Sequence, residues 1–289
     1  MTSTPTSLEL RKRRPHRYDP ALQGHKLTVA YRGTDFSGWQ GQRQAGKRTV
    51  QECIEAALEK IWGAKISLQG SGRTDTGVHA LGQIASFNAP RRHKQTDLLR
   101  ALNANLPRDV RIVKCRLVSP AFHARFDAKG KTYRYLIWNR FVQDPFTLDT
   151  HWHVPRSLDL PAMRRAARML LGKHDFASFT SNPGYERETK VRTMKRVSIV
   201  RDGATLVFHF TADGFLYRMV RNLVGALVKV GLGKISADDF GKILRACSRS
   251  EAPATAPACG LYLMSVVYPS NRTYGTHKTD RTTEDASVE

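Results

Sequence analysis

Strand and helix patterns recur in two successive groups along this 289-residue chain, although the groups share no strict sequence repeat. Alternating apolar residues predict strands in both groups. In the second group, only Arg201, Asp202 and Gly203 separate the strands predicted at 194–200 and 204–210. So short a connection joins strands that run antiparallel. We therefore expect an α+β fold, with two similar halves that share a large antiparallel sheet.

Local signals give the expected bounds of these elements. Thr49-Val50-Gln51-Glu52 has the form of a capping box that begins a helix, and Gly63 is a suitable end for it. Asp159 is a suitable N-cap for another helix, which Gly172 ends. Further helices are expected at 96–106, 216–230 and 236–247. The remaining strands are expected at 26–31, 65–69, 82–88, 110–117, 131–138 and 261–267.

Both ends of the chain differ in composition from its middle. Residues 1–24 are rich in Ser, Thr and Pro and contain the basic cluster Arg11–Arg14, and the last residues are polar without periodicity. Such segments bury too little apolar surface to fold. We expect a disordered basic tail at 1–24, an N-terminal α+β half at 25–120, a C-terminal α+β half at 121–268 and a disordered tail at 269–289.

The charge of the chain favours a polyanionic partner. There are 47 Lys and Arg against 25 Asp and Glu, which gives a net charge of +22. The basic residues lie throughout the chain and are not confined to a tail. Nucleic acid is the expected partner of a protein with such an excess.

The sequence argues against a membrane anchor and against a metal site. No apolar run approaches the roughly 18 residues of a membrane-spanning helix, and the first residues lack the apolar core of a secretory signal. The cysteines, Cys53, Cys115, Cys247 and Cys259, form no Cys-x-x-Cys pair. Neither a zinc site nor a disulfide framework is therefore expected. The pattern fits a reducing compartment, and we expect a cytoplasmic protein.

The stretch GSGRTDTGVHALGQIASF, residues 70–87, places Asp75 between glycines. It lacks the third glycine of a dinucleotide loop and the Gly-Lys-Ser/Thr of a P-loop, which argues against a mononucleotide site. Asp75-Thr76-Gly77 matches the triplet of aspartic proteases, but no second triplet supplies the partner carboxylate. Taken alone, the stretch also fits a plain turn.

Further segments of the chain favour a functional role for this stretch over a plain turn. They are YRGTDFSGWQGQ (31–42), LNANLP (102–107), FHARFDAKGKTYRY (122–135), GFLYRMVRNLVG (214–225) and APACGLYL (256–263). Together with GRTDTGVHALGQ, they resemble the tRNA pseudouridine synthase A family in order and spacing, over about residues 26–268.

The resemblance implies an enzyme that isomerises uridine to pseudouridine at positions 38, 39 and 40 in the anticodon stem-loop of tRNAs. It also implies a homodimer that needs neither a metal nor an organic cofactor. Its implied fold has two α+β halves, a continuous antiparallel sheet and a basic central cleft. A non-catalytic RNA-binding protein, or a member of the same family with another RNA target, is the alternative interpretation.

Asp75 matches the catalytic aspartate of this family. The reaction breaks the N1–C1′ bond, rotates the uracil and joins its C5 to C1′. A carboxylate could attack C1′ as a nucleophile, or it could remove a sugar proton to give a glycal-like intermediate, and the sequence leaves both routes open. A buried carboxylate needs a cationic partner, and the resemblance supplies Arg221, which stands in a largely apolar helix pattern.

Tyr133 matches the active-site tyrosine, whose ring can stack on the uracil and whose hydroxyl could transfer a proton. The alternative is a strand aromatic with no role. The resemblance makes Arg73 the residue that enters the stem when the target uridine flips out, the alternative being a phosphate contact. Other basic residues are expected to bind the RNA backbone, namely Arg43, Lys47, Arg125, Lys129, Lys131 and Arg134.

Overall fold

The computed structural model describes residues 21–40, 48–91, 94–182 and 189–269, so both predicted tails lie almost wholly outside it. The first strand nevertheless begins at Leu22, inside the segment predicted to be disordered. Residues 22–24 pair with residues 88–90 of a strand that extends to Pro90. That partner strand is longer than the sequence pattern suggested, and its backbone groups hold the three extra residues.

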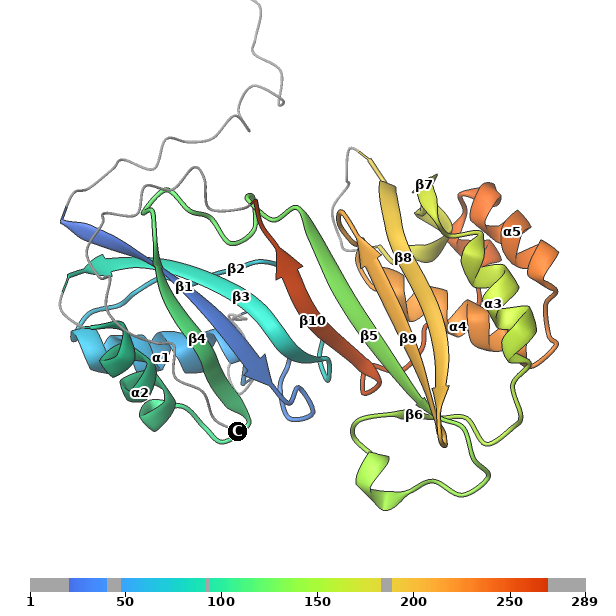
Figure 1. Cartoon of the computed structure of the whole chain (residues 1–289), viewed down its shortest axis with the longest axis horizontal. Helices are drawn as coiled ribbons and strands as arrows, with labels where there is room; N and C mark the ends of the chain where they lie inside the picture. Colours follow the sequence, from blue (N-terminus) through green and yellow to red (C-terminus); the bar gives the residue numbers. More distant parts are fainter. Residues whose placement is uncertain (1–20, 41–47, 92–93, 183–188, 270–289) are drawn as a thin grey trace, which may run out of the picture.

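The first half of the chain forms a three-stranded part of the sheet, with a fourth very short strand, and two helices packed against it (Figure 1). Predicted and observed elements agree closely here, apart from the strand expected at 65–69. The elements are β1 Leu22–Tyr31, α1 Val50–Trp62, β2 Gln69–Gly70, β3 His79–Pro90, α2 Gln95–Asn105 and β4 Val110–Val118, and the second half begins with β5 Gly130–Trp138.

The second half adds further strands and three helices. Asp159 caps α3 as expected from the sequence, and Ser236 caps α5, since each side chain accepts a hydrogen bond from an amide of the first turn. The elements are β6 Trp152–His153, α3 Leu160–Arg168, β7 Gly172–Asp175, β8 Val191–Asp202, β9 Thr205–Ala212, α4 Met219–Gly231, α5 Ala237–Ala246 and β10 Leu261–Val267, with single 3-10 turns at Pro145–Thr147, Ala177–Phe179 and Arg249–Glu251.

The strand predicted at 65–69 is wrong except at its end, where β2 covers only Gln69–Gly70. Side chains of α1 take the place of a neighbouring strand. The Glu55 carboxylate accepts the Leu68 amide at 2.9 Å, and the Gln51 side-chain amide donates to the Leu68 carbonyl at 3.2 Å. The backbone of Leu68 is therefore satisfied by helix side chains rather than by a ladder.

One sheet runs through the whole molecule, in the order β4-β1-β3-β10-β5-β9-β8-β7 (Figure 1). The expected α+β class and the continuous sheet are confirmed. The sheet is not antiparallel throughout, because β10 runs parallel to β3 where the two halves meet, through the pairs Tyr262–His79 and Leu263–Ala80. β10 reaches this place from the helices of the second half and not through a hairpin, so nothing forces an antiparallel pairing.

The halves share one core. Buried side chains of the first half, such as Val29 and Leu58, belong to the same apolar cluster as Tyr135 and Phe208 of the second. A core that is continuous across the junction fixes the relative position of the halves. Loops from each half that end at the β3–β10 junction are therefore held at defined distances from one another.

Candidate active site

Asp75 lies in the loop between β2 and β3, immediately before the strand pair that joins the halves. The loop is anchored from the first half. The Thr74 carbonyl accepts the Trp39 amide at 3.2 Å, and the Thr74 hydroxyl lies 2.8 Å from the buried Tyr31 hydroxyl. The Val78 amide closes a turn onto the Asp75 carbonyl at 3.1 Å. The carboxylate therefore stands on a fixed backbone.

A second set of contacts holds the start of this loop. The Gln83 side chain makes two of these contacts. Its Oε1 accepts a hydrogen bond from the Ser71 hydroxyl at 2.6 Å, and its Nε2 donates to the Gly72 carbonyl at 2.8 Å. The Lys131 ammonium donates to the Ser71 carbonyl at 2.8 Å. Lys131, which the sequence suggested as an RNA contact, thus ties β5 to the loop that carries Asp75.

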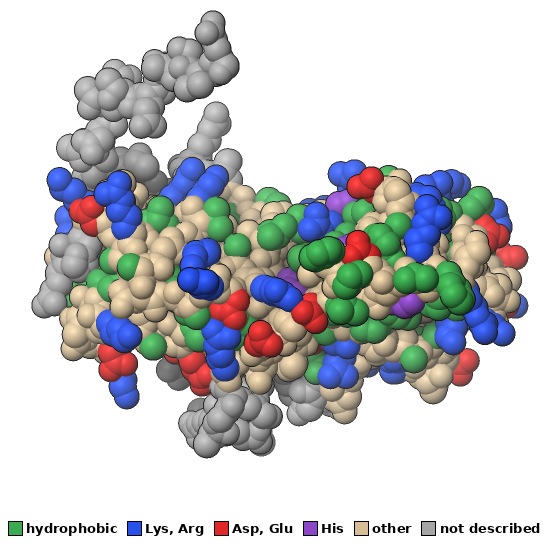
Figure 2. Space-filling model, turned by 90° about the horizontal axis from the view of Figure 1, so that it is seen from below, with side chains coloured by type: hydrophobic (Ala, Val, Ile, Leu, Met, Phe, Trp, Pro, Cys, Tyr) green, Lys and Arg blue, Asp and Glu red, His purple; other side chains and the backbone are tan. Residues whose placement is uncertain are grey.

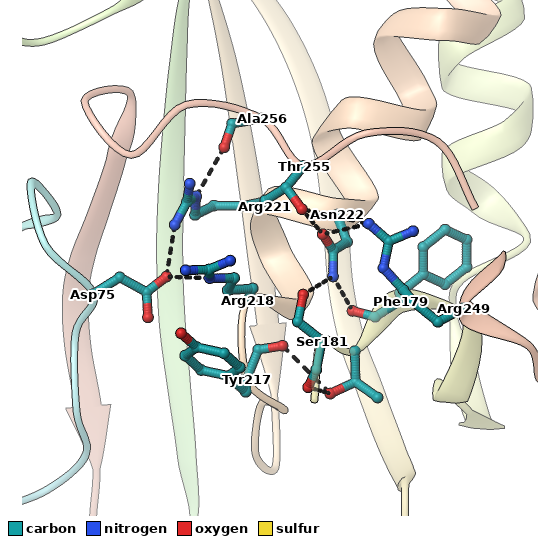
Figure 3. A network of polar contacts seen from close by, with 11 residues as sticks. Asp75, Phe179, Ser181, Tyr217, Arg218, Arg221, Asn222, Arg249, Thr255 and Ala256 are labelled. Atoms are coloured by element: carbon teal, nitrogen blue, oxygen red, sulfur yellow. Dashed lines mark hydrogen bonds and ion pairs between the residues drawn. The ribbon is translucent and has the colours of Figure 1, made fainter. Parts of the chain in front are cut away.

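Asp75 and Arg221 form the ion pair that the sequence led us to expect, although they lie 146 positions apart in the chain. Arg221 Nη1 is 2.8 Å from Asp75 Oδ2, and the two side chains are 13% and 18% exposed. Arg221 Nε also donates to the Ala256 carbonyl at 2.8 Å (Figure 3). A guanidinium can hold both oxygens of a carboxylate, but the contact described here is to one of them, Oδ2.

Arg218 is a site residue that the sequence analysis missed. Its Nε lies 3.9 Å from Asp75 Oδ2, and its guanidinium lies over the Tyr217 ring, 5.0 Å from the centroid. The predicted helix began at 216, which would have made Arg218 an ordinary helical residue. Helix α4 in fact begins at Met219, and Arg218 is its N-cap in the left-handed region, with φ of 57°. Its spacing of three residues from Arg221 was the available signal.

Tyr133 lies on β5, between Leu263 of β10 and Phe210 of β9. Its ring packs edge-on against Phe215, with centroids 4.8 Å apart, and it lines the same cavity as Asp75. Burial raises the pKa of the Tyr133 hydroxyl well above its usual range, and the negative charge of Asp75 raises the pKa further. The phenol therefore stays protonated at neutral pH.

Asp75, Tyr133 and Arg218 line a cavity of about 840 Å³. An adjoining hollow of about 490 Å³ shares Asp75, Arg73 and Arg218 with it and is also lined by Arg221. Arg73 is exposed, as is Arg125, whose guanidinium lies 5.8 Å from the Phe126 ring centroid. The described basic residues of the larger cavity are Arg73, Arg125, Lys131, Arg192 and Arg218. The predicted basic cleft is therefore present at the junction of the halves. Arg43 and Lys47 lie outside the described residues.

The described residues offer neither a cluster of metal ligands nor a membrane-spanning helix. Residues 21–40, 48–91, 94–182 and 189–269 contain no group of three His, Cys, Asp or Glu side chains that could hold a metal ion. Within these same ranges, no helix is both long and apolar enough to cross a membrane. All four cysteines are free thiols, and Cys53 and Cys115 pack against the core.

Comparison with known proteins identifies the family. Residues 27–127 and 166–269 match the family model described as tRNA pseudouridine synthase. A curated protein named tRNA pseudouridine synthase A from Methylacidiphilum infernorum (isolate V4) is 52% identical over 87% of this chain and 98% of its own length. The proteins of that name from Solidesulfovibrio magneticus and Acetivibrio thermocellus are each 46% identical, over 84% and 86% of this chain and 90% and 100% of their own lengths. The chain therefore belongs to the tRNA pseudouridine synthase family.

Proposed function

We propose that this protein isomerises uridine to pseudouridine at positions 38, 39 and 40 in the anticodon stem-loop of tRNAs. The observation that carries the proposal is the ion pair of Asp75 and Arg221, which is largely buried and opens into a basic cavity between the halves. A protein that only bound RNA would need the basic residues but would have no use for an aspartate in that place. Family membership supports the reaction class, and the geometry supports the residue roles proposed below.

Asp75 is proposed to act at the sugar of the flipped uridine. Its carboxylate either bonds to C1′ as uracil leaves through N1, or takes a sugar proton as the same bond breaks. In both routes the released uracil rotates and bonds to C1′ through C5, as the Asp75–C1′ bond breaks or as Asp75 returns the proton to the sugar. The C5 proton is then lost and N1 takes up a proton, so the product is an isomer of the substrate. No electrons are gained or lost overall, and we propose that neither a metal nor an organic cofactor takes part.

Arg221 is proposed to hold the Asp75 carboxylate in position. Its guanidinium is held between Asp75 and the Ala256 carbonyl, so it cannot turn away without breaking a second hydrogen bond. Hydrogen bonds between a guanidinium and a carboxylate are among the stronger ones in proteins, so they fix the direction of the carboxylate. The burial of Asp75 and Arg221 also limits the access of water, which could otherwise add to the sugar after the glycosidic bond breaks.

Tyr133 is proposed to hold the uracil by stacking, because its ring lines the cavity beside Asp75. Stacking of one base on an aromatic ring is worth roughly 1–3 kcal/mol. Its raised pKa makes the hydroxyl a weak acid. Arg73, which is exposed at the mouth of both hollows, is proposed to enter the stem as the uridine leaves it. Arg125, Lys131 and Arg43 are proposed to contact the RNA.

We also propose a cytoplasmic homodimer. Four large apolar side chains are exposed on the long connection between β5 and β6, which projects at the bottom of Figure 1. Phe141 is 86% exposed, Val142 73%, Phe146 92% and Leu148 58%. Hydrophobic side chains gather on the right-hand part of the face in Figure 2, where a second copy would cover them. The free thiols fit a reducing compartment.

The test is to incubate the purified protein with tRNA transcripts and map pseudouridine by carbodiimide treatment and primer extension. We expect stops at positions 38, 39 and 40 where uridine is present, and none where cytidine replaces it. Stops elsewhere, or in messenger RNA only, would assign another target to the same site. No pseudouridine in any RNA that the protein binds would leave it as a binding protein.

A further inference from the structure

The backbone of Arg218 is held in a conformation that arginine rarely adopts. Within the described residues, Arg218 and Cys247 are the non-glycine residues with positive φ. The left-handed region is unfavourable for a residue with a Cβ, and such residues persist where the surroundings fix them. Cys247 merely ends helix α5. Arg218 instead begins the helix that carries Arg221, beside Asp75.

The neighbours of Arg218 hold it in place from both sides (Figure 3). Before it, the Tyr217 carbonyl accepts hydrogen bonds from the Ser181 amide at 3.2 Å and the Thr180 hydroxyl at 3.3 Å. After it, the amide of the fully buried Asn222 donates to the Arg218 carbonyl at 3.0 Å. The Asn222 side chain bonds in turn to the Phe179 carbonyl at 2.9 Å and the Thr255 hydroxyl at 2.6 Å.

This arrangement directs the Arg218 guanidinium into the cavity without a hydrogen bond to Asp75. The Asp75 oxygen nearest to Arg218 is already bonded to Arg221 at 2.8 Å, whereas Arg218 Nε stays at 3.9 Å. That distance is too long for a hydrogen bond. The Arg218 side chain is 41% exposed and lines both hollows. The planar fork of an arginine suits a phosphate, which it can hold through two parallel hydrogen bonds.

We infer that Arg218 is a further substrate-binding residue, which holds the phosphate of the target nucleotide while its sugar lies against Asp75. The inference rests on the proposed function, because it takes the sugar of a uridine to be the group at Asp75. A phosphate joined to that sugar then lies close to Asp75, and Arg218 is a partly exposed cation 3.9 Å from the Asp75 carboxylate. Arg221 holds the carboxylate and Arg218 holds the substrate, one helical turn apart.

The test measures tRNA binding over a range of salt concentrations. Arg218→Gln should weaken binding about tenfold and lower the slope of log Kd against log salt by about one, since one phosphate contact is lost. Arg218→Lys keeps the charge and should restore the slope. The control is Arg245→Gln, because Arg245 is exposed on α5 and does not line the cavity. It should change neither Kd nor slope.

Repeating the measurement in the Asp75→Asn variant distinguishes a phosphate contact of Arg218 from an effect that acts through Asp75. In Asp75→Asn protein, Arg218→Gln should cause the same loss of affinity and the same change in slope. With Asp75 intact, the single-turnover rate at subsaturating protein should fall about tenfold, in step with the loss of affinity. A normal Kd with a large fall in that rate would overturn the inference, and so would a binding loss that vanishes in Asp75→Asn protein.

Arg218→Asn tests whether the backbone alone explains the effect, because asparagine tolerates the left-handed region better than glutamine does. We expect Asn and Gln to weaken binding alike, and restored binding in Arg218→Asn would refute the phosphate role. The wild-type assay for pseudouridine is separate from these measurements. If wild-type protein forms no pseudouridine, the proposed function fails, whereas the salt slopes still decide whether Arg218 holds a phosphate.

Discussion

Asp75 and Arg73 are two residues apart, yet the fold gives them different surroundings. Asp75 is largely buried and paired with Arg221, whereas Arg73 is exposed at the mouth of the cavity. The Thr74 side chain between them is buried against Tyr31. We therefore expect substitutions of Asp75 and of Arg73 to impair different steps of the reaction, although the two residues share one short loop.

Arg73→Ala should lose most activity on a tRNA whose target uridine is base-paired. The reason is that the group proposed to fill the vacated stack is missing, while opening a pair costs a few kcal/mol. The loss should shrink on a tRNA with a mismatch at that pair. Single-turnover rates on the two substrates measure the difference.

Low salt is the control for this comparison. If Arg73 only contacts a phosphate, the loss should be uniform on both substrates and relieved at low salt. Equal fold-losses on paired and mismatched tRNA would therefore rule out the flipping role of Arg73.

At this scale the sequence predicted what motif and chemistry determine together. The pairing of Asp75 with Arg221 could be predicted, because the resemblance identified both segments and a carboxylate in this setting needs a cation. The left-handed backbone of Arg218 and the contact of Lys131 with Ser71 could not be predicted. Both depend on which distant segments pack beside them, and no local pattern records that.

At the scale of an element, the loop of Asp75 depends on a glycine in another loop. Gly38 has φ of 90°, and a Cβ there would lie 2.6 Å from the Thr74 carbonyl, next to Asp75. Any side chain must push this backbone away. Gly203 also has positive φ, 56°, but a Cβ there would meet nothing within 4 Å.

These two glycines form a matched pair for a test. Both Gly38→Ala and Gly203→Ala should cost about 1 kcal/mol of folding stability from the left-handed backbone. Gly38→Ala should in addition lower the turnover rate by about 100-fold, because displacing a catalytic group by about 1 Å can cost that much. Urea unfolding and single-turnover rates are the measurements. Similar rates in the two variants would show that the position of Asp75 does not depend on Gly38.

Elements with strong local signals were predictable, and elements made by distant partners were not. Helix α1 begins after Thr49 and ends at Gly63, as the cap residues indicated. Residues 65–68 looked like a strand, but Gln51 and Glu55 of α1 bind the backbone of Leu68. The parallel pairing of β3 with β10 also depends on a connection that no local pattern describes.

At the scale of the whole molecule, His79 is a buried contact between distant segments. Its Nδ1 accepts the Gly33 amide at 3.0 Å, so the proton is on Nε2, which donates to the carbonyls of Asp149 and Cys259 at 3.0 Å each. Burial lowers the pKa of His79, although these carbonyls partly oppose the shift. A second proton, on Nδ1, would break the bond to Gly33.

Stability should therefore fall as the pH drops below about 6.5, the usual pKa of histidine in an unfolded chain. Below that pH the unfolded chain takes up a proton that folded His79 takes up only at lower pH, so acid favours unfolding. Burial also lowers the pKa of His151 and of His209, which adds to the same trend. Urea unfolding between pH 5 and 7 measures the slope, and His79→Gln should flatten it. An unchanged slope in that variant would contradict the assignment.

The most direct measurement of the central claim compares wild-type protein with Asp75→Asn, in which an amide replaces the carboxylate at nearly the same shape. The two proteins should bind tRNA with dissociation constants within a few-fold of each other. The variant should form pseudouridine at below roughly one per cent of the wild-type single-turnover rate, because an amide can neither attack C1′ nor accept a sugar proton. If Asp75→Asn keeps more than a few per cent of that rate, Asp75 is not the catalytic group.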